Sequence, residues 1–190
     1  EVEWWRNPGS ASPTGGGASS AIWQKHLVGA TINMSKMIEV ADVNGDSRPD
    51  IVATDSENVD SGLFWFEAPA EPVGGKWIRH EIVKGYNGLD SLSVADMNGD
   101  GRLDFVALQI GTSEGGLSLP DYVYTNNGSG QFTRTTLPDN LNVHDHRLAL
   151  ADFRHTGRLD IAANISTINH TNAFVTWQTS NMVWVNNGGT

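Results

Sequence analysis

Two nine-residue segments of the chain place oxygen-bearing side chains at alternate positions. In DVNGDSRPD, residues 42–50, and in DMNGDGRLD, residues 96–104, they stand at loop positions one, three, five and nine. The side chains are Asp42, Asn44, Asp46 and Asp50 in the first segment and Asp96, Asn98, Asp100 and Asp104 in the second. Calcium takes about six to eight oxygen ligands, and this alternation wraps them around one point. The spacing therefore predicts one calcium site in each loop.

Position seven of each loop offers a backbone carbonyl as a further ligand, from Arg48 in one loop and Arg102 in the other. A calcium loop between two helices would carry a bidentate Glu at position twelve, where this chain has Ala53 and Ala107. The flanking residues are also strand-like, so that class of calcium site is disfavoured. An Asx-rich turn that binds no metal is the alternative interpretation.

A third segment, DFRHTGRLD at residues 152–160, keeps only part of the pattern. Asp152 and Asp160 remain, but Arg154 and Thr156 occupy positions three and five. A cationic side chain beside the two carboxylates replaces the charge of a metal, so we predict no calcium here. The surviving carboxylates are expected to cap backbone N–H groups instead.

The residues six positions before each leading Asp form a second set of candidates. They are Lys36, Asp90 and His146, which differ in charge although the surrounding segments agree. His144 lies two residues before His146, and strand alternation directs both side chains to the same side. A His-x-His pair of this kind is a half-site for a transition metal such as zinc. Two solvated loop histidines are the alternative interpretation.

Both sets of candidates lie in a sequence repeat. Three segments align as IEVADVNGDSRPDIVAT, LSVADMNGDGRLDFVAL and LALADFRHTGRLDIAAN, and their leading Asp residues are 54 and 56 residues apart. Each repeat continues with short segments rich in β-branched and aromatic residues, bounded by Gly, Asn or Pro, which are typical of strands. No window keeps the apolar period of a long helix. The sequence therefore predicts an all-β fold, a β-propeller of four-stranded antiparallel blades.

We designate the four strand positions of a repeat A to D in chain order, with the Asp loop joining A to B. The chain then starts with strands C and D of a first blade at residues 1–30. Complete blades follow at 35–84 and 89–137, and strands A to C of a last blade follow at 145–190. Two complete and two incomplete blades form only a partial ring, because closed propellers have about four to eight blades. The expected partners are the remaining blades of a longer chain or another subunit.

The amino-acid composition restricts further which classes of partner the chain could bind. The 190 residues carry a formal net charge of −10, which repels phosphate backbones and disfavours nucleic acid. No apolar stretch is long enough for membrane insertion. The chain has no cysteine, which excludes disulfides and zinc–thiolate sites. We expect a secreted, extracellular glycoprotein, in keeping with four Asn-x-Ser/Thr sequons at Asn33, Asn127, Asn164 and Asn169.

With the loops DVNGDSRPD and DMNGDGRLD in place, the repeats resemble the FG-GAP/VCBS family of integrin-like, calcium-binding β-propellers. That family includes fungal and bacterial lectins and polysaccharide-processing proteins. The resemblance implies that the calcium loops between strands A and B are structural and lie opposite most ligand sites. It implies little about activity, because one propeller scaffold hosts many functions.

Three hypotheses about function remain open. The first is lectin-like carbohydrate recognition by a calcium-stabilised propeller, because amide-rich and aromatic-bearing loops suit sugar hydroxyls and apolar sugar faces. The second, suggested by the resemblance, is a metal-dependent carbohydrate lyase or dehydratase, with His144 and His146 as ligands and Asp90 or His170 as the base. His170 belongs to the segment 164–181, which is expected to be a long loop between strands B and C. The third is an adhesion or scaffold propeller with protein partners.

Overall fold

The computed structural model describes the chain at residues 1–7, 23–30, 34–56, 62–85, 89–109, 120–128, 130–138, 143–171 and 174–188. At residues 34, 56, 143–146, 165–171 and 174–182 it describes the backbone alone. Every regular element within these ranges is a β-strand. The described residues contain no helix long and apolar enough to cross a membrane. The predicted all-β class is therefore confirmed.

The thirteen described strands form four antiparallel sheets. The first sheet contains β1 (Val2–Arg6) and β2 (Gln24–Gly29). The second contains β3 (Met34–Ala41), β4 (Asp50–Ser56), β5 (Gly62–Glu67) and β6 (Ile78–Lys84). The third contains β7 (Leu89–Ala95), β8 (Asp104–Gln109), β9 (Tyr122–Asn126) and β10 (Phe132–Thr136). The fourth contains β11 (Val143–Ala151), β12 (Asp160–Thr171) and β13 (Phe174–Trp184).

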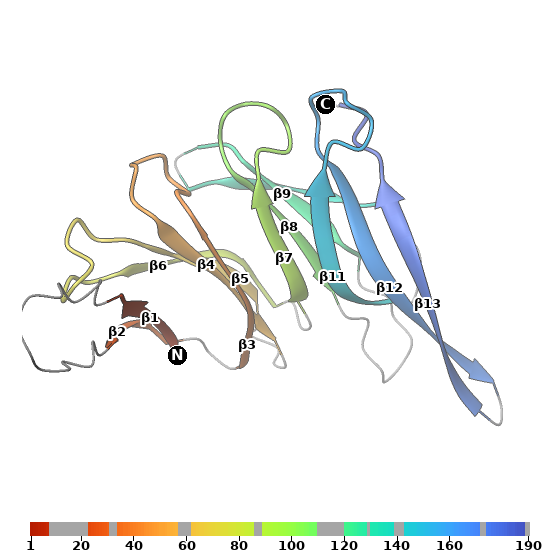
Figure 1. The fold of residues 1–190 in the computed structure, drawn as a ribbon, viewed down its shortest axis with the longest axis horizontal. Coiled ribbons are helices and arrows are strands. Elements are labelled where there is room, and N and C mark those ends of the chain that lie inside the picture. The colour runs from red at the N-terminus through yellow and green to blue at the C-terminus, as the bar shows by residue number, and fades with distance from the viewer. Residues whose placement is uncertain are drawn as a thin grey trace, which may run out of the picture.

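Strands that follow each other along the chain are neighbours within every sheet. The sheets themselves stand side by side in an arc (Figure 1). Their A strands are adjacent, since β3 contacts β7 and β7 contacts β11. The predicted four-stranded antiparallel sheets are thus present twice in the described residues, and closure of the arc into a propeller stays a prediction.

Apolar layers between the sheets hold the arc together. Successive side chains of a strand point to opposite faces, so one strand serves two layers. On β8, Phe105 and Ala107 pack in the layer shared with the second sheet, while Val106 and Leu108 pack in the layer shared with the fourth sheet. Because both faces are covered, strand B is an almost continuous apolar run.

The segment 164–181 is strand rather than loop over most of its length. The strands β12 and β13 pair without interruption from Ile161 opposite Trp184 to Thr171 opposite Phe174. The loop prediction was wrong because it gave this repeat the short strands of the others, whereas β12 and β13 are 12 and 11 residues long. A neighbouring strand satisfies the backbone hydrogen bonds of a polar segment as well as those of an apolar one.

Candidate functional site

The leading Asp of each loop organises the turn through backbone N–H groups. The carboxylate of Asp42 accepts hydrogen bonds from the N–H groups of Gly45 (2.8 Å), Asp46 (3.0 Å) and Ser47 (2.8 Å). The equivalent donors to Asp96 are Gly99 (2.7 Å), Asp100 (3.1 Å) and Gly101 (2.8 Å). The donors to Asp152 in the third loop are Thr156 (2.9 Å) and Gly157 (2.7 Å). One turn geometry therefore recurs three times, and the predicted capping role of the third leading Asp is confirmed.

Loop positions four and six adopt a left-handed backbone. Their φ angles lie between 55° and 81° in all three loops, at Gly45 and Ser47, Gly99 and Gly101, and His155 and Gly157. This conformation costs a residue with a Cβ atom on the order of 1 kcal/mol. Ser47 and His155 therefore carry a local strain that glycine avoids at the same positions.

The carboxylate at position five is shared between the loop and an arginine. Asp46 accepts hydrogen bonds from the backbone N–H of Arg48 (2.8 Å) and the amide of Asn44 (2.9 Å), and it forms an ion pair with the Arg48 guanidinium. The Nε of Arg48 donates to the carbonyl oxygen of Ala68 at 2.9 Å, which ties the loop to the end of β5. The second loop repeats these contacts with Asp100, Asn98, Arg102 and Asn126. The hydrogen bonds from Asn98 and Arg102 hold the pKa of Asp100 below its usual range.

The carboxylate at position nine is fully buried and braces the loop against its sheet. Asp50 accepts hydrogen bonds from the backbone N–H groups of Val43 (3.0 Å) and Ala68 (2.8 Å). Asp104 accepts the equivalent bonds from Met97 and Asn126, both at 2.8 Å. Burial raises the pKa of both buried carboxyl groups, and the hydrogen bonds from the backbone N–H groups offset part of this rise. The negative charge of the other two Asp side chains in each loop raises the pKa further. Uncompensated negative charge therefore gathers in both loops.

The third loop balances its charge with an arginine. The Nη2 of Arg154 lies 3.0 Å from one carboxylate oxygen of Asp160, and its Nε lies 3.3 Å from the other. The same guanidinium donates to the carbonyl oxygen of Asn186 at 2.6 Å. The hydrogen bond from Arg154, followed by one from the backbone N–H of Asn186, holds the pKa of Asp160 below its usual range. The expectation that a cationic side chain compensates the surviving carboxylates is confirmed for Asp160.

The two intact loops offer the kind of donors that calcium prefers. Each supplies three carboxylates, one side-chain amide and a backbone carbonyl within nine residues, and all of these are hard oxygen ligands. In the part of the chain that the structure describes, no three His, Asp or Glu side chains are grouped as they would be around a metal ion. The donor set fits calcium in chemistry and spacing, and the ligand roles of these residues stay predictions.

An asparagine at the end of β9 connects the second loop to the first. The backbone N–H of Asn126 donates to Asp104, and its side-chain amide donates to the carbonyl oxygen of Val43 at 3.0 Å. Val43 in turn donates its own N–H to Asp50. Hydrogen bonds therefore run without a break from the buried carboxylate of one loop to that of the next.

The same connection recurs between the second and third loops. The backbone N–H of Asn186 donates to Asp160 at 2.8 Å, and its amide donates to the carbonyl oxygen of Met97 at 2.9 Å. We call this chain of bonds through Asn126 and Asn186 the asparagine relay. Our sequence analysis missed it, although the repeated Asn-Asn-Gly at residues 126–128 and 186–188 was a signal.

The region with both intact loops also matches a known protein family. Residues 42–107 match the family model described as FG-GAP-like repeat. They form an FG-GAP-like repeat. No match was found among curated proteins or among solved structures. The resemblance that the loop motifs suggested is therefore confirmed over this segment.

Strand A precedes the Asp loop in each of the three repeats, and its pairing with strand B is irregular at its start. The pairing with strand B shifts between Ser35 and Ile38, between Leu89 and Ser91, and between Asp145 and Arg147. These short segments contain Lys36, Asp90 and His146, which we call the strand-start positions. A β-bulge re-aims nearby side chains and is over-represented next to active sites. The residues that the sequence singled out therefore share a backbone feature.

Two of the strand-start positions are in contact. The Nζ of Lys36 lies 3.1 Å from a carboxylate oxygen of Asp90, so neighbouring sheets place equivalent residues side by side. His146 occupies the same position on β11, which contacts β7. The register shift falls at His146, so simple alternation does not apply between it and His144. A shared orientation of the two histidines stays a prediction.

His170 lies further along the fourth sheet. It pairs with Val175, whereas His144 pairs with Ser166. The four residue steps from Ser166 to His170 span about 13 Å of strand, at about 3.3 Å per step. The structure therefore does not bring the backbone of His170 beside the strand-start positions.

Proposed function

We propose that this chain is a calcium-stabilised β-repeat module in which two of the three Asp loops bind the cation. The charge balance of the loops supports this. The first and second loops each contain three carboxylates and one guanidinium, whereas the third contains two of each. The neutral Asn44 and Asn98 occupy the position from which Arg154 pairs with Asp160. A divalent cation would supply in the first two loops the positive charge that Arg154 supplies in the third.

The proposed ligands are side chains at loop positions one, three, five and nine and the carbonyl at position seven. They are Asp42, Asn44, Asp46, Arg48 and Asp50 in one loop and Asp96, Asn98, Asp100, Arg102 and Asp104 in the other. Calcium would neutralise carboxylates that repel one another at short range. Because Val43 and Met97 directly follow the leading Asp residues and bind the asparagine relay, the order imposed on each loop would extend to the next sheet.

Calcium titration of the full chain tests this proposal. We expect two calcium ions per chain by elemental analysis and a lower melting temperature in excess chelator. Asp96→Asn should remove one ion, because it weakens the ligand set while an amide oxygen still caps the turn. Asp152→Asn is the matched control in the third loop and should leave the calcium content unchanged. A chain without calcium, whose melting temperature is the same with and without chelator, would contradict the proposal.

We further propose that the module recognises carbohydrate near the strand-start positions. The repeated register shift and the contact between Lys36 and Asp90 support a polar site assembled from neighbouring sheets. Removing the pair by Lys36→Ala with Asp90→Ala should weaken binding on a glycan array at least about tenfold, with the calcium content intact. The exposed ion pair between Lys25 and Glu3 gives the control, since Lys25→Ala should leave glycan binding unchanged. Equal binding by all variants would move the sugar site elsewhere.

The enzymatic alternative, a carbohydrate lyase or dehydratase, uses His144 and His146 as ligands of a transition metal such as zinc. The position of His170 on β12 favours Asp90 over His170 as its base. His144→Ala with His146→Ala should then abolish both turnover and binding of the second metal, while calcium binding persists. A protein-binding adhesion or scaffold role becomes the better proposal if neither sugar binding nor turnover is found. Secretion is tested by measuring how the protein is distributed between the medium and the cells that naturally produce it.

A further inference from the structure

The asparagine relay fixes the same backbone unit in both intact loops. Val43 and Met97 stand between loop positions one and three, which both supply proposed calcium ligands. The N–H group of each donates to the buried carboxylate at position nine, at 3.0 Å in the first loop and 2.8 Å in the second. The carbonyl oxygen of each accepts a hydrogen bond from an asparagine of the next sheet, Asn126 or Asn186. The order of the first two ligands in each loop therefore depends on that asparagine.

The asparagine that holds the second loop is itself held without a metal. The backbone N–H of Asn186 donates to Asp160, and its carbonyl oxygen accepts a hydrogen bond from Arg154 at 2.6 Å. Arg154 also forms an ion pair with Asp160, so opposite charges face each other at this point. The second loop is thus braced by a part of the chain whose charges are balanced whether or not calcium is present.

The asparagine that holds the first loop depends instead on the second loop. The backbone N–H of Asn126 donates to Asp104 at 2.8 Å, and its carbonyl oxygen accepts a hydrogen bond from the Nε of Arg102, also at 2.8 Å. Both partners are proposed ligands of one calcium ion, Asp104 through its carboxylate and Arg102 through its backbone carbonyl. The negative charges of Asp96 and Asp100 act on Asp104 in the same loop, and like charges repel. The first loop is therefore held most firmly when the second loop contains its ion.

We propose that the second loop binds calcium before the first loop does, because the third loop orders it in advance. This inference rests on the proposed function, since it concerns the same two sites. A loop that is already ordered loses less binding free energy to ordering, so it binds its ion more tightly. Once the second loop holds its ion, Asn126 is held firmly and the affinity of the first loop rises. The effect is mutual, because thermodynamic linkage requires each ion to raise the affinity for the other by the same factor.

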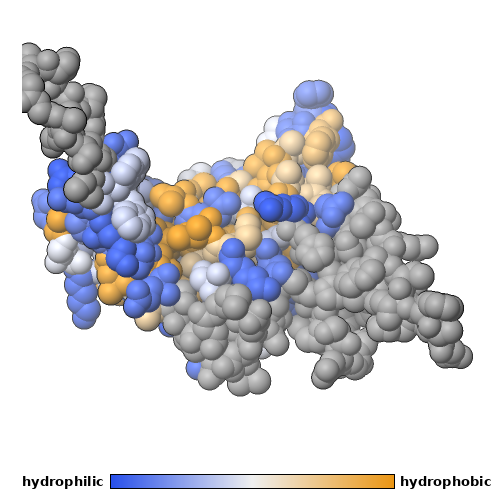
Figure 2. Space-filling model, turned by 60° about the horizontal axis from the view of Figure 1, so that its bottom comes forward, coloured by the Kyte–Doolittle hydropathy of each residue, from blue (hydrophilic) through white to orange (hydrophobic). Residues whose placement is uncertain are grey.

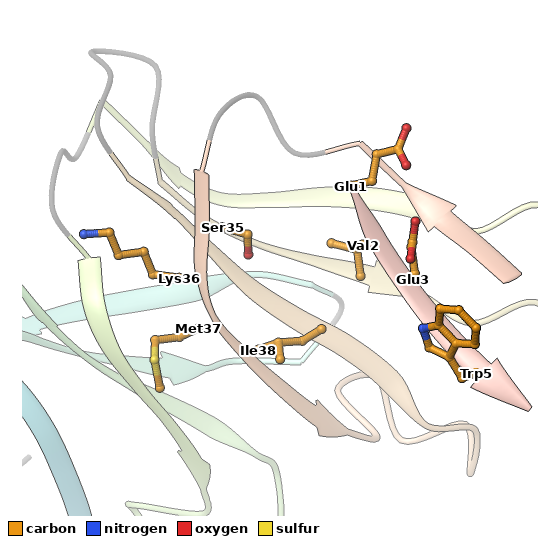
Figure 3. Close-up of a pocket in the computed structure, with 8 residues that line it drawn as sticks. All are labelled: Glu1, Val2, Glu3, Trp5, Ser35, Lys36, Met37 and Ile38. Carbon is orange, nitrogen blue, oxygen red and sulfur yellow. The ribbon is translucent and has the colours of Figure 1, made fainter. Parts of the chain in front are cut away.

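The packing between the second and third sheets does not depend on the loops. Met37 of β3 packs against the apolar layer that contains Leu92 and Phe105 of the third sheet. Figure 3 shows Lys36 and Met37 on the side of β3 away from β1, and Lys36 pairs with Asp90 of β7. Hydrophobic side chains also gather in the middle of the face shown in Figure 2. We therefore expect the chain to stay folded when a loop loses its ion, so the affinities of variants are comparable.

Calorimetric calcium titrations of the full chain test the order of binding. Asp42→Asn leaves the second loop as the intact site, and its affinity should match that of the first ion bound by the unmodified chain. Asp96→Asn leaves the first loop, which should bind at least about fivefold more weakly than the unmodified chain binds its second ion. In the unmodified chain, hydrogen exchange of the Gly99 amide should slow at a lower calcium concentration than that of the Gly45 amide, since each donates to the leading Asp of its loop.

The positioning role of Arg154 is tested in the Asp42→Asn chain. Arg154→Ala should weaken calcium binding to the second loop at least about fivefold, although Arg154 is not a proposed ligand. Arg154→Lys keeps a positive charge beside Asp160 and should restore most of this affinity. The control is Arg158→Ala, because this exposed arginine of the same loop donates to the carbonyl oxygen of Asn187 at 3.4 Å, outside the relay. It should leave the affinity of the second loop unchanged.

Independent binding overturns the inference. It would appear as two single-site chains whose affinities are the same as those of the two ions in the unmodified chain. An unchanged affinity after Arg154→Ala also overturns it, as does protection of the Gly45 amide before that of Gly99. If the unmodified chain binds no calcium, the proposed function fails and this inference fails with it. Two ions bound independently refute this inference alone, so the two failures are distinguishable.

Discussion

Asn126→Ala should destabilise the chain far more than its place at the end of a strand suggests. The side chain is buried, and its amide donates to the carbonyl oxygens of Val43 at 3.0 Å and Leu103 at 3.2 Å. Its oxygen accepts a hydrogen bond from the N–H of Gly128 at 2.9 Å. The substitution removes all three bonds and breaks the asparagine relay between the first and second loops.

The expected magnitude follows from the number and burial of these bonds. A hydrogen bond contributes about 0.5–1.5 kcal/mol, and a buried polar group left without a partner costs about 1–3 kcal/mol. We therefore expect the free energy of unfolding to fall by about 3 kcal/mol. For a chain of this size, about 2–4 °C of melting temperature corresponds to each kcal/mol, so the melting temperature should fall by about 6–12 °C.

Urea unfolding of the full chain in constant calcium measures this change. Asn127→Ala is the matched control, since the neighbouring side chain is exposed and donates to the hydroxyl of Thr133 at 2.8 Å. Its effect should stay within about 0.5 kcal/mol. A loss below about 1 kcal/mol for Asn126→Ala would refute the view that the relay joins neighbouring sheets.

Other predictions concern the loops. Arg154→Asn with Thr156→Asp restores the ligand pattern of the intact loops, so calorimetry should detect one calcium ion more than in the unmodified chain; an unchanged count would contradict the charge-balance argument. Arg154→Ala should change how the free energy of unfolding depends on pH in acid. Because the pKa of Asp160 is lowered in the folded chain, the Arg154–Asp160 pair stabilises the fold above the usual Asp pKa of about 4. This stabilisation is lost as the pH falls through the lowered pKa. Ser47→Gly should raise the melting temperature slightly and Gly101→Ser should lower it, because both positions are left-handed; shifts of the opposite sign would show that the strain argument fails.

Local patterns explain why much of the fold was predictable. The Asp loops and the apolar strands beside them depend on residues close in the chain, such as Asp42 and Ser47, so their turn could be inferred from sequence. The compensation of Asp160 by Arg154 was predictable for the same reason.

The missed features depend on two sheets at once. Asn126 acts on Val43, which is 83 residues away, and no local pattern reveals that contact. The register shifts at the strand-start positions likewise arise from pairing between strands. The hairpin of β12 and β13 was mistaken for a loop because these strands extend beyond the positions at which the aligned repeats end theirs.

The asparagine relay has a direction along the chain. Each asparagine reaches back to a loop that precedes it in sequence, from Asn126 to Val43 and from Asn186 to Met97. During synthesis the amino-terminal repeats appear first, so each acceptor carbonyl is available before its donor emerges from the ribosome. Every new repeat then finds a finished surface on which to dock, and the arc is able to grow by successive addition from its amino-terminal end.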